Sequence, residues 1–170
     1  MPKHALLLMT LLVLCLLLPG CPLEELPPDR QNGGSTGAAV ATIEQRAFDL
    51  VNIERANHGL PALVMDSAIR GVARRHSQEM AAYNYFNHTN LAGMSPADRL
   101  NNAGIPWRVA GENIAYNSGH ADPAAAAVVS WMNSPGHRAN ILNAEYTHTG
   151  MGVARQENGL HFYTQVFVGR

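Results

Sequence analysis

Residues 131–142 read WMNSPGHRANIL, and two shorter segments, GENIA at 111–115 and FNH at 86–88, belong with this stretch. The three segments contain two histidines and one glutamate, namely His88, Glu112 and His137. Neither the helical nor the strand periodicity of the surrounding apolar residues calls for histidine or glutamate at these places. We therefore take these three residues as the candidate functional site.

Together, the three segments resemble the sequence pattern of the CAP superfamily, which comprises cysteine-rich secretory proteins, antigen 5, plant pathogenesis-related proteins and their bacterial relatives. The resemblance extends from about Ile43 to Phe167, nearly the whole of the domain. It implies an α+β fold of the CAP/SCP type, a three-layer α–β–α sandwich in which helices flank an antiparallel sheet.

The resemblance also implies a cleft lined by the candidate residues. His88 and His137 match the two cleft histidines of the family, and Glu112 matches a cleft glutamate. A further glutamate is usual in the family near Trp131, but residues 132–134 are Met, Asn and Ser here. The missing carboxylate argues against any mechanism that needs two carboxylates.

The chemistry of the three side chains permits a metal site. Imidazole and carboxylate groups are good ligands for Zn²⁺, and a His₂Glu set with one open position is the arrangement of catalytic zinc sites. We therefore predict Zn²⁺ or another divalent cation as a cofactor held by His88, Glu112 and His137. These residues do not share one helix face, as the ligands of an HExxH motif do, so only the fold can bring them together. The same groups could also transfer protons in catalysis.

A structural role is the alternative for each candidate residue. His88 and Glu112 could hydrogen-bond to each other and hold the shape of the cleft. Glu112 could instead cap a turn at Gly111, and His137 could cap main-chain carbonyl groups of a short helix. Ser134 is an unconvincing nucleophile, because it begins a helix in a Ser-Pro pair and lies in no Gly-x-Ser-x-Gly motif.

The chain begins with a pattern typical of a bacterial lipoprotein signal. A short positive segment is followed by the apolar stretch Ala5–Leu18 and by Leu-Pro-Gly-Cys, which ends at Cys21. We predict a signal peptide over residues 1–20 and a lipid on Cys21 that anchors the protein outside the cytoplasm, at an outer membrane or the cell surface. An ordinary signal peptide cut near Gly20, giving a secreted protein, is the alternative.

A linker and one domain follow the predicted signal. Residues 21–41 are rich in Pro, Gly and polar residues and poor in large apolar ones, so we expect a flexible linker. Residues 42–170 form the predicted CAP/SCP domain. This domain contains no cysteine, because Cys15 and Cys21 both precede it, whereas the eukaryotic family members are stapled by disulfides. Its stability must therefore come from its core.

The charge pattern excludes one class of partner. The formal net charge is -1, and basic and acidic residues are interspersed along the chain. The sequence has no basic run and no phosphate-binding glycine loop, so we do not expect nucleic acid as a partner.

Local signals predict where helices and strands begin and end. Thr42 and Glu44 are placed to open a first helix, as N-cap and as an acidic residue in the first turn. Asp66 is placed to cap a second helix, whose apolar face includes His76 as a core residue. Three more helix starts are expected where a capping residue precedes proline, at Ser95-Pro96, Asp122-Pro123 and Ser134-Pro135. Strands are expected at Val109–Tyr116, Thr149–Ala154 and Leu160–Val168, the last two joined by a turn at Asn158-Gly159.

Three functions remain open at this point. The first is a lipid-anchored binding domain for a metal ion or a small ligand, including a lipid or another envelope component. The second is an interaction module of the cell envelope without catalytic activity. The third is a metal-assisted hydrolase or peptidase of the envelope. We rank binding first and enzymatic activity last.

Overall fold

The computed structural model describes residues 33–170, so the predicted signal peptide, Cys21 and the first part of the predicted linker lie outside the described residues. The helices are α1 (Gly33–Asn57), α2 (Ser67–Tyr83), α3 (Pro96–Asn102), α4 (Pro123–Asn133) and α5 (Pro135–Ile141). The strands are β1 (Val64–Met65), β2 (Val109–Asn117), β3 (His148–Arg155) and β4 (His161–Gly169).

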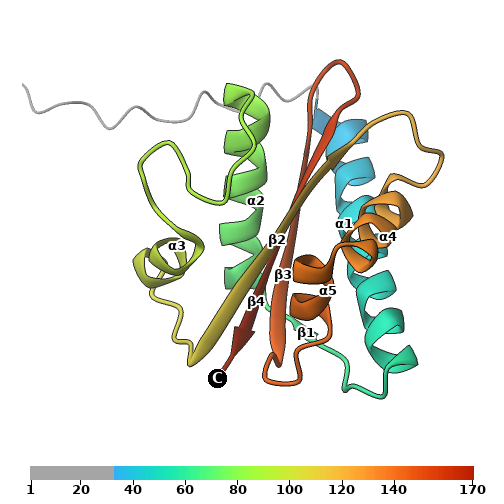
Figure 1. Ribbon diagram of the computed structural model, residues 1–170. Coiled ribbons are helices and arrows are strands. Elements are labelled where there is room, and N and C mark those ends of the chain that lie inside the picture. Colours follow the sequence, from blue (N-terminus) through green and yellow to red (C-terminus); the bar gives the residue numbers. More distant parts are fainter. Residues whose placement is uncertain (1–32) are drawn as a thin grey trace, which may run out of the picture.

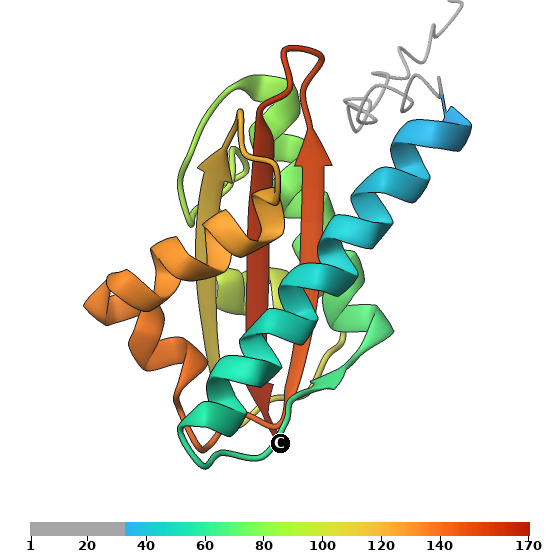
Figure 2. The ribbon, with the colours of Figure 1, turned by 90° about the vertical axis from the view of Figure 1, so that its right-hand side faces the viewer.

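The strands form one sheet in the order β1-β3-β4-β2. β4 pairs antiparallel with both β2 and β3, as predicted, but β1 pairs parallel with β3. The sheet is therefore mixed, because the chain that leaves α1 adds two residues to the edge of β3 before α2 begins. Helices α2 and α3 lie on one face of the sheet and α1, α4 and α5 on the other, which gives the predicted three layers (Figures 1 and 2).

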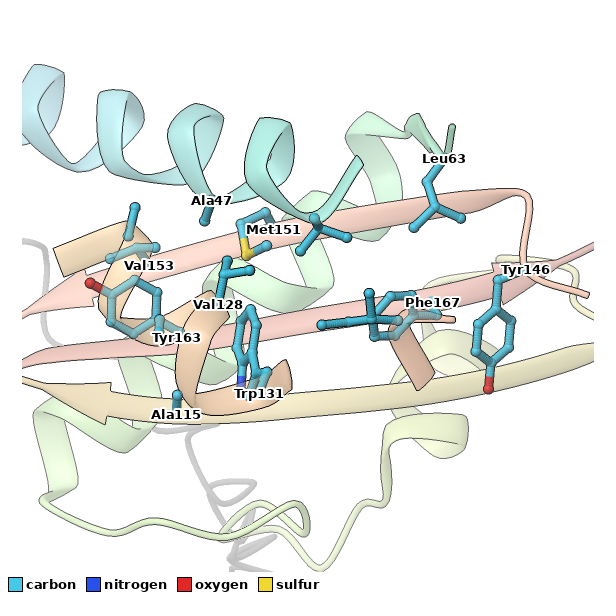
Figure 3. Packing of buried hydrophobic residues seen from close by; sticks show 14 residues of the cluster. Ala47, Leu63, Ala115, Val128, Trp131, Tyr146, Met151, Val153, Tyr163 and Phe167 are labelled. Carbon is cyan, nitrogen blue, oxygen red and sulfur yellow. The ribbon is translucent and has the colours of Figure 1, made fainter. Parts of the chain in front are cut away.

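Alternation along β4 divides the core between the two faces. Tyr163 and Phe167 belong to the larger cluster under α1 and α4, where they pack with Trp131 (Figure 3). Val166 belongs to a second cluster with α2. Gln165 shares the face of Tyr163 and Phe167, because alternate residues of a strand point to the same side.

Two glycines allow α2 to lie directly on β3. A Cβ atom at Gly150 would overlap the main chain of α2 at Ile69 and Arg70, and one at Gly152 would overlap it a turn later, at Ala73. Any larger residue at either position would push the helix off the sheet. This close approach fixes the height of α2 above the sheet.

Most of the predicted helix starts are confirmed. The Asp66 side chain accepts hydrogen bonds from the main-chain N–H groups of Ala68 and Ile69 and caps α2. Ser95 and Asp98 form a complete capping box at α3, and Asp122 caps α4. α5 begins at the predicted Pro135, but the Ser134 side chain makes no capping hydrogen bond.

The predicted start of the first helix is wrong. Thr42 lies inside α1, where its hydroxyl donates to the carbonyl oxygen of Ala38 at 3.0 Å, and the helix already begins at Gly33. Residues 37–41 are mostly alanine, the best helix former, and Val40 packs against the core. The helix therefore extends into the second half of the predicted linker, residues 21–41.

An ion pair between a buried glutamate and a partly exposed arginine joins α1, α2 and β3. Glu44, which is 2% exposed, accepts hydrogen bonds from Arg74 Nε at 2.8 Å and from Arg74 Nη2 at 2.5 Å. Its Oε1 also accepts the main-chain N–H of Val153 at 3.1 Å. The hydrogen bond to Glu44 raises the pKa of Arg74. The expectation that Glu44 serves the first turn of a helix is therefore wrong, because its carboxylate points into the protein and fastens two helices to the sheet.

Candidate functional site

The candidate site is built on β2, an edge strand of the sheet. Glu112 pairs with Val166 of β4, so its side chain lies on the face covered by α2 and α3. The next residue, Asn113, pairs with Gln165 and lies on the face covered by α4 and α5. Consecutive residues of this edge strand thus serve both layers of helices.

His88 and Glu112 form a hydrogen-bonded pair. The distance from His88 Nδ1 to Glu112 Oε1 is 2.9 Å, and the side-chain exposures are 48% and 1%. The alternative of a turn cap at Gly111 is wrong, because Gly111 lies within β2. The segment that carries His88 follows α2 and reaches back to the strand, so the pair joins a loop to the sheet edge.

The pairing determines which nitrogen of His88 carries the proton. An ionised carboxylate only accepts hydrogen bonds, so Nδ1 must be the donor and Nε2 is left without a proton in the neutral ring. None of the described residues hydrogen-bonds to His88 Nε2. Glu112 therefore fixes the imidazole through Nδ1, and Nε2 remains free to bind a ligand.

Arg99 holds the second oxygen of Glu112. Arg99 Nη2 donates to Glu112 Oε2 at 2.5 Å, and the two side chains are 7% and 1% exposed. Arg99 Nη1 donates to the main-chain oxygens of His88 and Met94 at 2.7 and 3.1 Å. The sequence reasoning missed Arg99. Its only local signal is its place directly after the capping-box residue Asp98, in the short helix α3.

His137 lies on α5, which two asparagines fasten to β2. Asn113 Nδ2 donates to the main-chain oxygen of His137 at 3.0 Å. Asn140 Nδ2 donates to the main-chain oxygen of Glu112 at 3.1 Å and to Asn113 Oδ1 at 2.9 Å. Burial and the nearby charge of His88 both lower the pKa of His137. The structure thus fastens both histidines to β2, His88 through Glu112 and the main chain of His137 through Asn113.

Gly111 makes room for this arrangement. A Cβ atom at Gly111 would overlap the hydroxyl of Tyr146 and touch Asn140 Oδ1. Gly111 is therefore needed for the close approach of α5 and the chain that follows it.

His88 is better placed than Glu112 to bind a metal ion. His88 keeps a free nitrogen, whereas both oxygens of Glu112 are already hydrogen-bonded to His88 and Arg99. Within residues 33–170, no group of three or more His, Cys, Asp and Glu side chains is arranged to hold a metal ion. Metal binding by all three predicted residues stays a prediction, and Glu112 fits better behind His88 than on the metal.

His76 has the predicted structural role. It is 1% exposed, and its Nε2–H donates to the main-chain oxygen of Asn87 at 2.9 Å. Burial, and then the charge of Arg99, lower the pKa of His76. The residue fastens the segment next to His88 onto α2.

The comparison with known proteins identifies the family. Residues 48–167 match the family model described as CAP, the cysteine-rich secretory protein family. The chain belongs to this family. The predicted superfamily is therefore confirmed.

Bacterial relatives of this CAP domain are longer proteins. The chain is 43% identical over 129 residues to the uncharacterized membrane protein YlbC of Bacillus subtilis (strain 168), covering 76% of the chain and 35% of YlbC. It is 40% identical over 136 residues to the uncharacterized protein YkwD of the same organism, covering 80% of the chain and 51% of YkwD. The chain thus spans between about a third and a half of these relatives.

A solved structure supports the fold. An extracellular protein containing a SCP domain from Bacillus anthracis str. Ames is 40% identical, with a TM-score of 0.68 over 76% of the chain and 41% of that protein. The α+β sandwich of the CAP type is therefore confirmed.

Two hollows lie on the surface of this CAP domain. One, of about 650 Å³, lies between α2, α3 and residues 90–94, with His76 and Arg99 on its wall. The other, of about 530 Å³, lies between β2 and α4, and its lining combines four alanines and Val129 with polar residues that include Asn117 and Ser130. The three candidate residues line neither hollow. Ligand binding at His88 and His137 would therefore take place at an open part of the surface.

Proposed function

We propose that this CAP domain is an extracytoplasmic binding module that holds a divalent cation, such as Zn²⁺, through the imidazoles of His88 and His137. The observation that carries the proposal is the hydrogen bond from His88 Nδ1 to Glu112, which leaves Nε2 of an exposed histidine free. The main-chain oxygen of the second histidine, His137, accepts a hydrogen bond from Asn113, the residue that follows Glu112. The charge of His88 also lowers the pKa of His137.

Glu112 acts behind the metal ligand in this proposal. Histidines that bind metals commonly donate their other N–H to a carboxylate, which fixes the tautomer and increases the basicity of the ligating nitrogen. His88 and Glu112 have this relationship. Two protein ligands leave further positions for water or for a ligand, and a bound Zn²⁺ would supply Lewis acidity to whatever occupies them.

The extracytoplasmic location rests on separate support. The Bacillus anthracis relative is described as an extracellular protein. The apolar segment at Ala5–Leu18 followed by Cys21 supports export and a lipid anchor. No helix among the described residues has the length and apolar character that crossing a membrane requires.

Zinc titration calorimetry tests the metal proposal. We expect saturable binding at one site in the purified protein and a loss of at least tenfold in affinity in His88→Ala and His137→Ala. His120→Ala, which removes an exposed histidine of a loop, is the matched control and should bind like the unchanged protein. Absence of saturable binding, or equal affinity in His88→Ala, would contradict the proposal. If zinc does bind, hydrolase assays with and without a chelator separate a metal-assisted enzyme from a binding module.

A small apolar ligand is a second candidate. It is favoured by the hollow between β2 and α4, whose wall carries Val129 with 58% of its surface exposed. Exposed apolar surface around a hollow often marks a ligand or partner site. A fluorescent acyl probe should bind there and be weakened by Val129→Asp, whereas His88→Ala should leave its binding unchanged. Equal probe binding by Val129→Asp would exclude this hollow as the site.

A further inference from the structure

One buried guanidinium contacts both parts of the His88–Glu112 pair. Arg99 donates to the carboxylate of Glu112 at 2.5 Å and to the main-chain oxygen of His88 at 2.7 Å. A third hydrogen bond, at 3.1 Å, reaches the main-chain oxygen of Met94, just before α3 begins. Arg99 therefore joins three segments: β2, the chain around His88 and the entry to α3.

The side chain of Arg99 is itself firmly placed. α3 is opened by the capping box of Ser95 and Asp98, and Leu100 is fully buried in the cluster under α2. The planar guanidinium can donate in several directions at once, which the single ammonium group of lysine cannot match at this site. Arginine is thus suited to a position that must reach a carboxylate and two carbonyl oxygens together.

The contact with Glu112 has a chemical consequence for His88. A carboxylate that is 1% exposed keeps its charge only if it is paired and hydrogen-bonded. Arg99 supplies the positive partner at Oε2, so Oε1 remains an acceptor for His88 Nδ1. The contact with the main-chain oxygen of His88 holds the ring over this acceptor.

We propose that Arg99 is the positioning residue of the candidate site: it keeps Glu112 as an acceptor and thereby selects the His88 tautomer that presents Nε2 to a ligand. This inference rests on the proposed function for its importance in ligand binding, but the tautomer itself can be measured without any ligand. Arg99 does not touch the ligand in this proposal and acts only through Glu112 and the His88 main chain.

The test compares Arg99→Met with Arg74→Met, which removes the arginine that pairs with the other buried glutamate, Glu44. The ¹⁵N chemical shifts of the imidazole rings, measured without metal at a pH where ordinary imidazole is neutral, report the tautomer of His88. We expect a single Nδ1–H tautomer in the unchanged protein and in Arg74→Met, and a mixture of tautomers in Arg99→Met. Zinc affinity should fall tenfold or more in Arg99→Met and stay unchanged in Arg74→Met.

A milder variant keeps the test decisive if Arg99→Met does not fold. Arg99→Lys retains the charge beside Glu112 but cannot make all three contacts, so we expect the Nδ1–H tautomer with zinc affinity between those of the unchanged protein and Arg99→Met. The proposal is overturned if either Arg99 variant loses thermal stability but keeps both the tautomer and the zinc affinity. If the unchanged protein binds no zinc, the proposed function fails, while the tautomer measurement still decides the role of Arg99.

Discussion

Two buried glutamates of this CAP domain have the same kind of partner and different surroundings. Glu44 pairs with Arg74 and Glu112 with Arg99, each at 2.5 Å between arginine Nη2 and a carboxylate oxygen. The third partner of Glu44 is the main-chain N–H of Val153, inside the sheet. The third partner of Glu112 is His88, a side chain that is about half exposed.

The nature of the third partner separates a structural pair from a functional one. A main-chain N–H and a guanidinium can only donate, so Glu44 must stay an acceptor on both oxygens. An imidazole can exchange donor and acceptor roles between its nitrogens, so His88 can either donate to residue 112 or accept from it. The Glu44 pair should therefore control stability, and the Glu112 pair should control the state of His88.

The largest effect is expected for Glu44→Gln. The amide would turn a donor toward groups that can only donate, and would leave the main-chain N–H of Val153 or the guanidinium of Arg74 without an acceptor. The Arg74 side chain is 39% exposed and can be solvated, so the cost comes mainly from unmet hydrogen bonds of buried groups. We expect a loss of about 1–3 kcal/mol in the free energy of unfolding. Chemical denaturation measures it. A cost below about 1 kcal/mol would remove the distinction between the two pairs.

Glu112→Gln should give a smaller loss of stability and a clear loss of function. The amide oxygen can still accept from Arg99, and the amide N–H₂ can donate to His88 Nδ1 once the ring changes its tautomer. We expect a cost of about 1 kcal/mol in unfolding, the size of one hydrogen bond. Zinc affinity should fall about tenfold or more, because Nε2 then carries the proton. Unchanged calorimetric titration of this variant would show that Glu112 does not set the tautomer.

The pH dependence of stability sharpens the comparison, because His76 lies beside the Arg99 pair. Its pKa is lowered in the folded state by burial, and then by Arg99. Above about pH 6.5, the ordinary imidazole pKa, His76 is neutral in both states. Below it the unfolded chain binds a proton that the folded protein resists, so stability falls with the pH until the folded pKa is passed.

Urea denaturation at a series of pH values checks this expectation. Stability should decline as the pH is lowered from about 7 to 5, and His76→Gln should show a shallower decline. The remaining slope belongs in part to His137 and His161, whose pKa values burial also lowers. An identical slope in His76→Gln would contradict the assignment.

The smallest effect is expected at an exposed ion pair. Arg46 and Asp122 lie 3.0 Å apart with side-chain exposures of 53% and 41%. Solvent-exposed pairs contribute about 0–1 kcal/mol, so Arg46→Gln should change the free energy of unfolding by less than about 0.5 kcal/mol. A cost equal to that of Glu44→Gln would show that burial is not what distinguishes the pairs.

The sequence was informative where the interaction is local. Asp66 and Ser95 cap helices through hydrogen bonds to residues two or three positions away, and such caps have recognisable patterns. The hairpin at Asn158-Gly159 formed as predicted, with Gly159 at a positive φ of 88°. The pairing of His88 with Glu112 was foreseen only as one alternative, and it followed from the family resemblance.

The sequence was uninformative where charged residues meet across long separations. Arg99 and Glu44 stand in helices like many surface residues, and periodicity gives no sign that each is buried and paired with a residue of another element. β1 was missed because two residues carry no alternation. The start of α1 was missed because glycine and proline near the predicted linker outweighed its alanines, whereas in the fold the packing of Val40 extends the helix.

A crystal structure of the zinc-bound protein tests the central claim most directly. With His88 and His137 as ligands and Glu112 behind His88, we expect Zn–N distances of about 2.0–2.1 Å to His88 Nε2 and to a ring nitrogen of His137. Glu112 should still be hydrogen-bonded to His88 Nδ1 and Arg99. A Glu112 oxygen at about 2.0–2.2 Å from the metal, with the Arg99 contact broken, would contradict it.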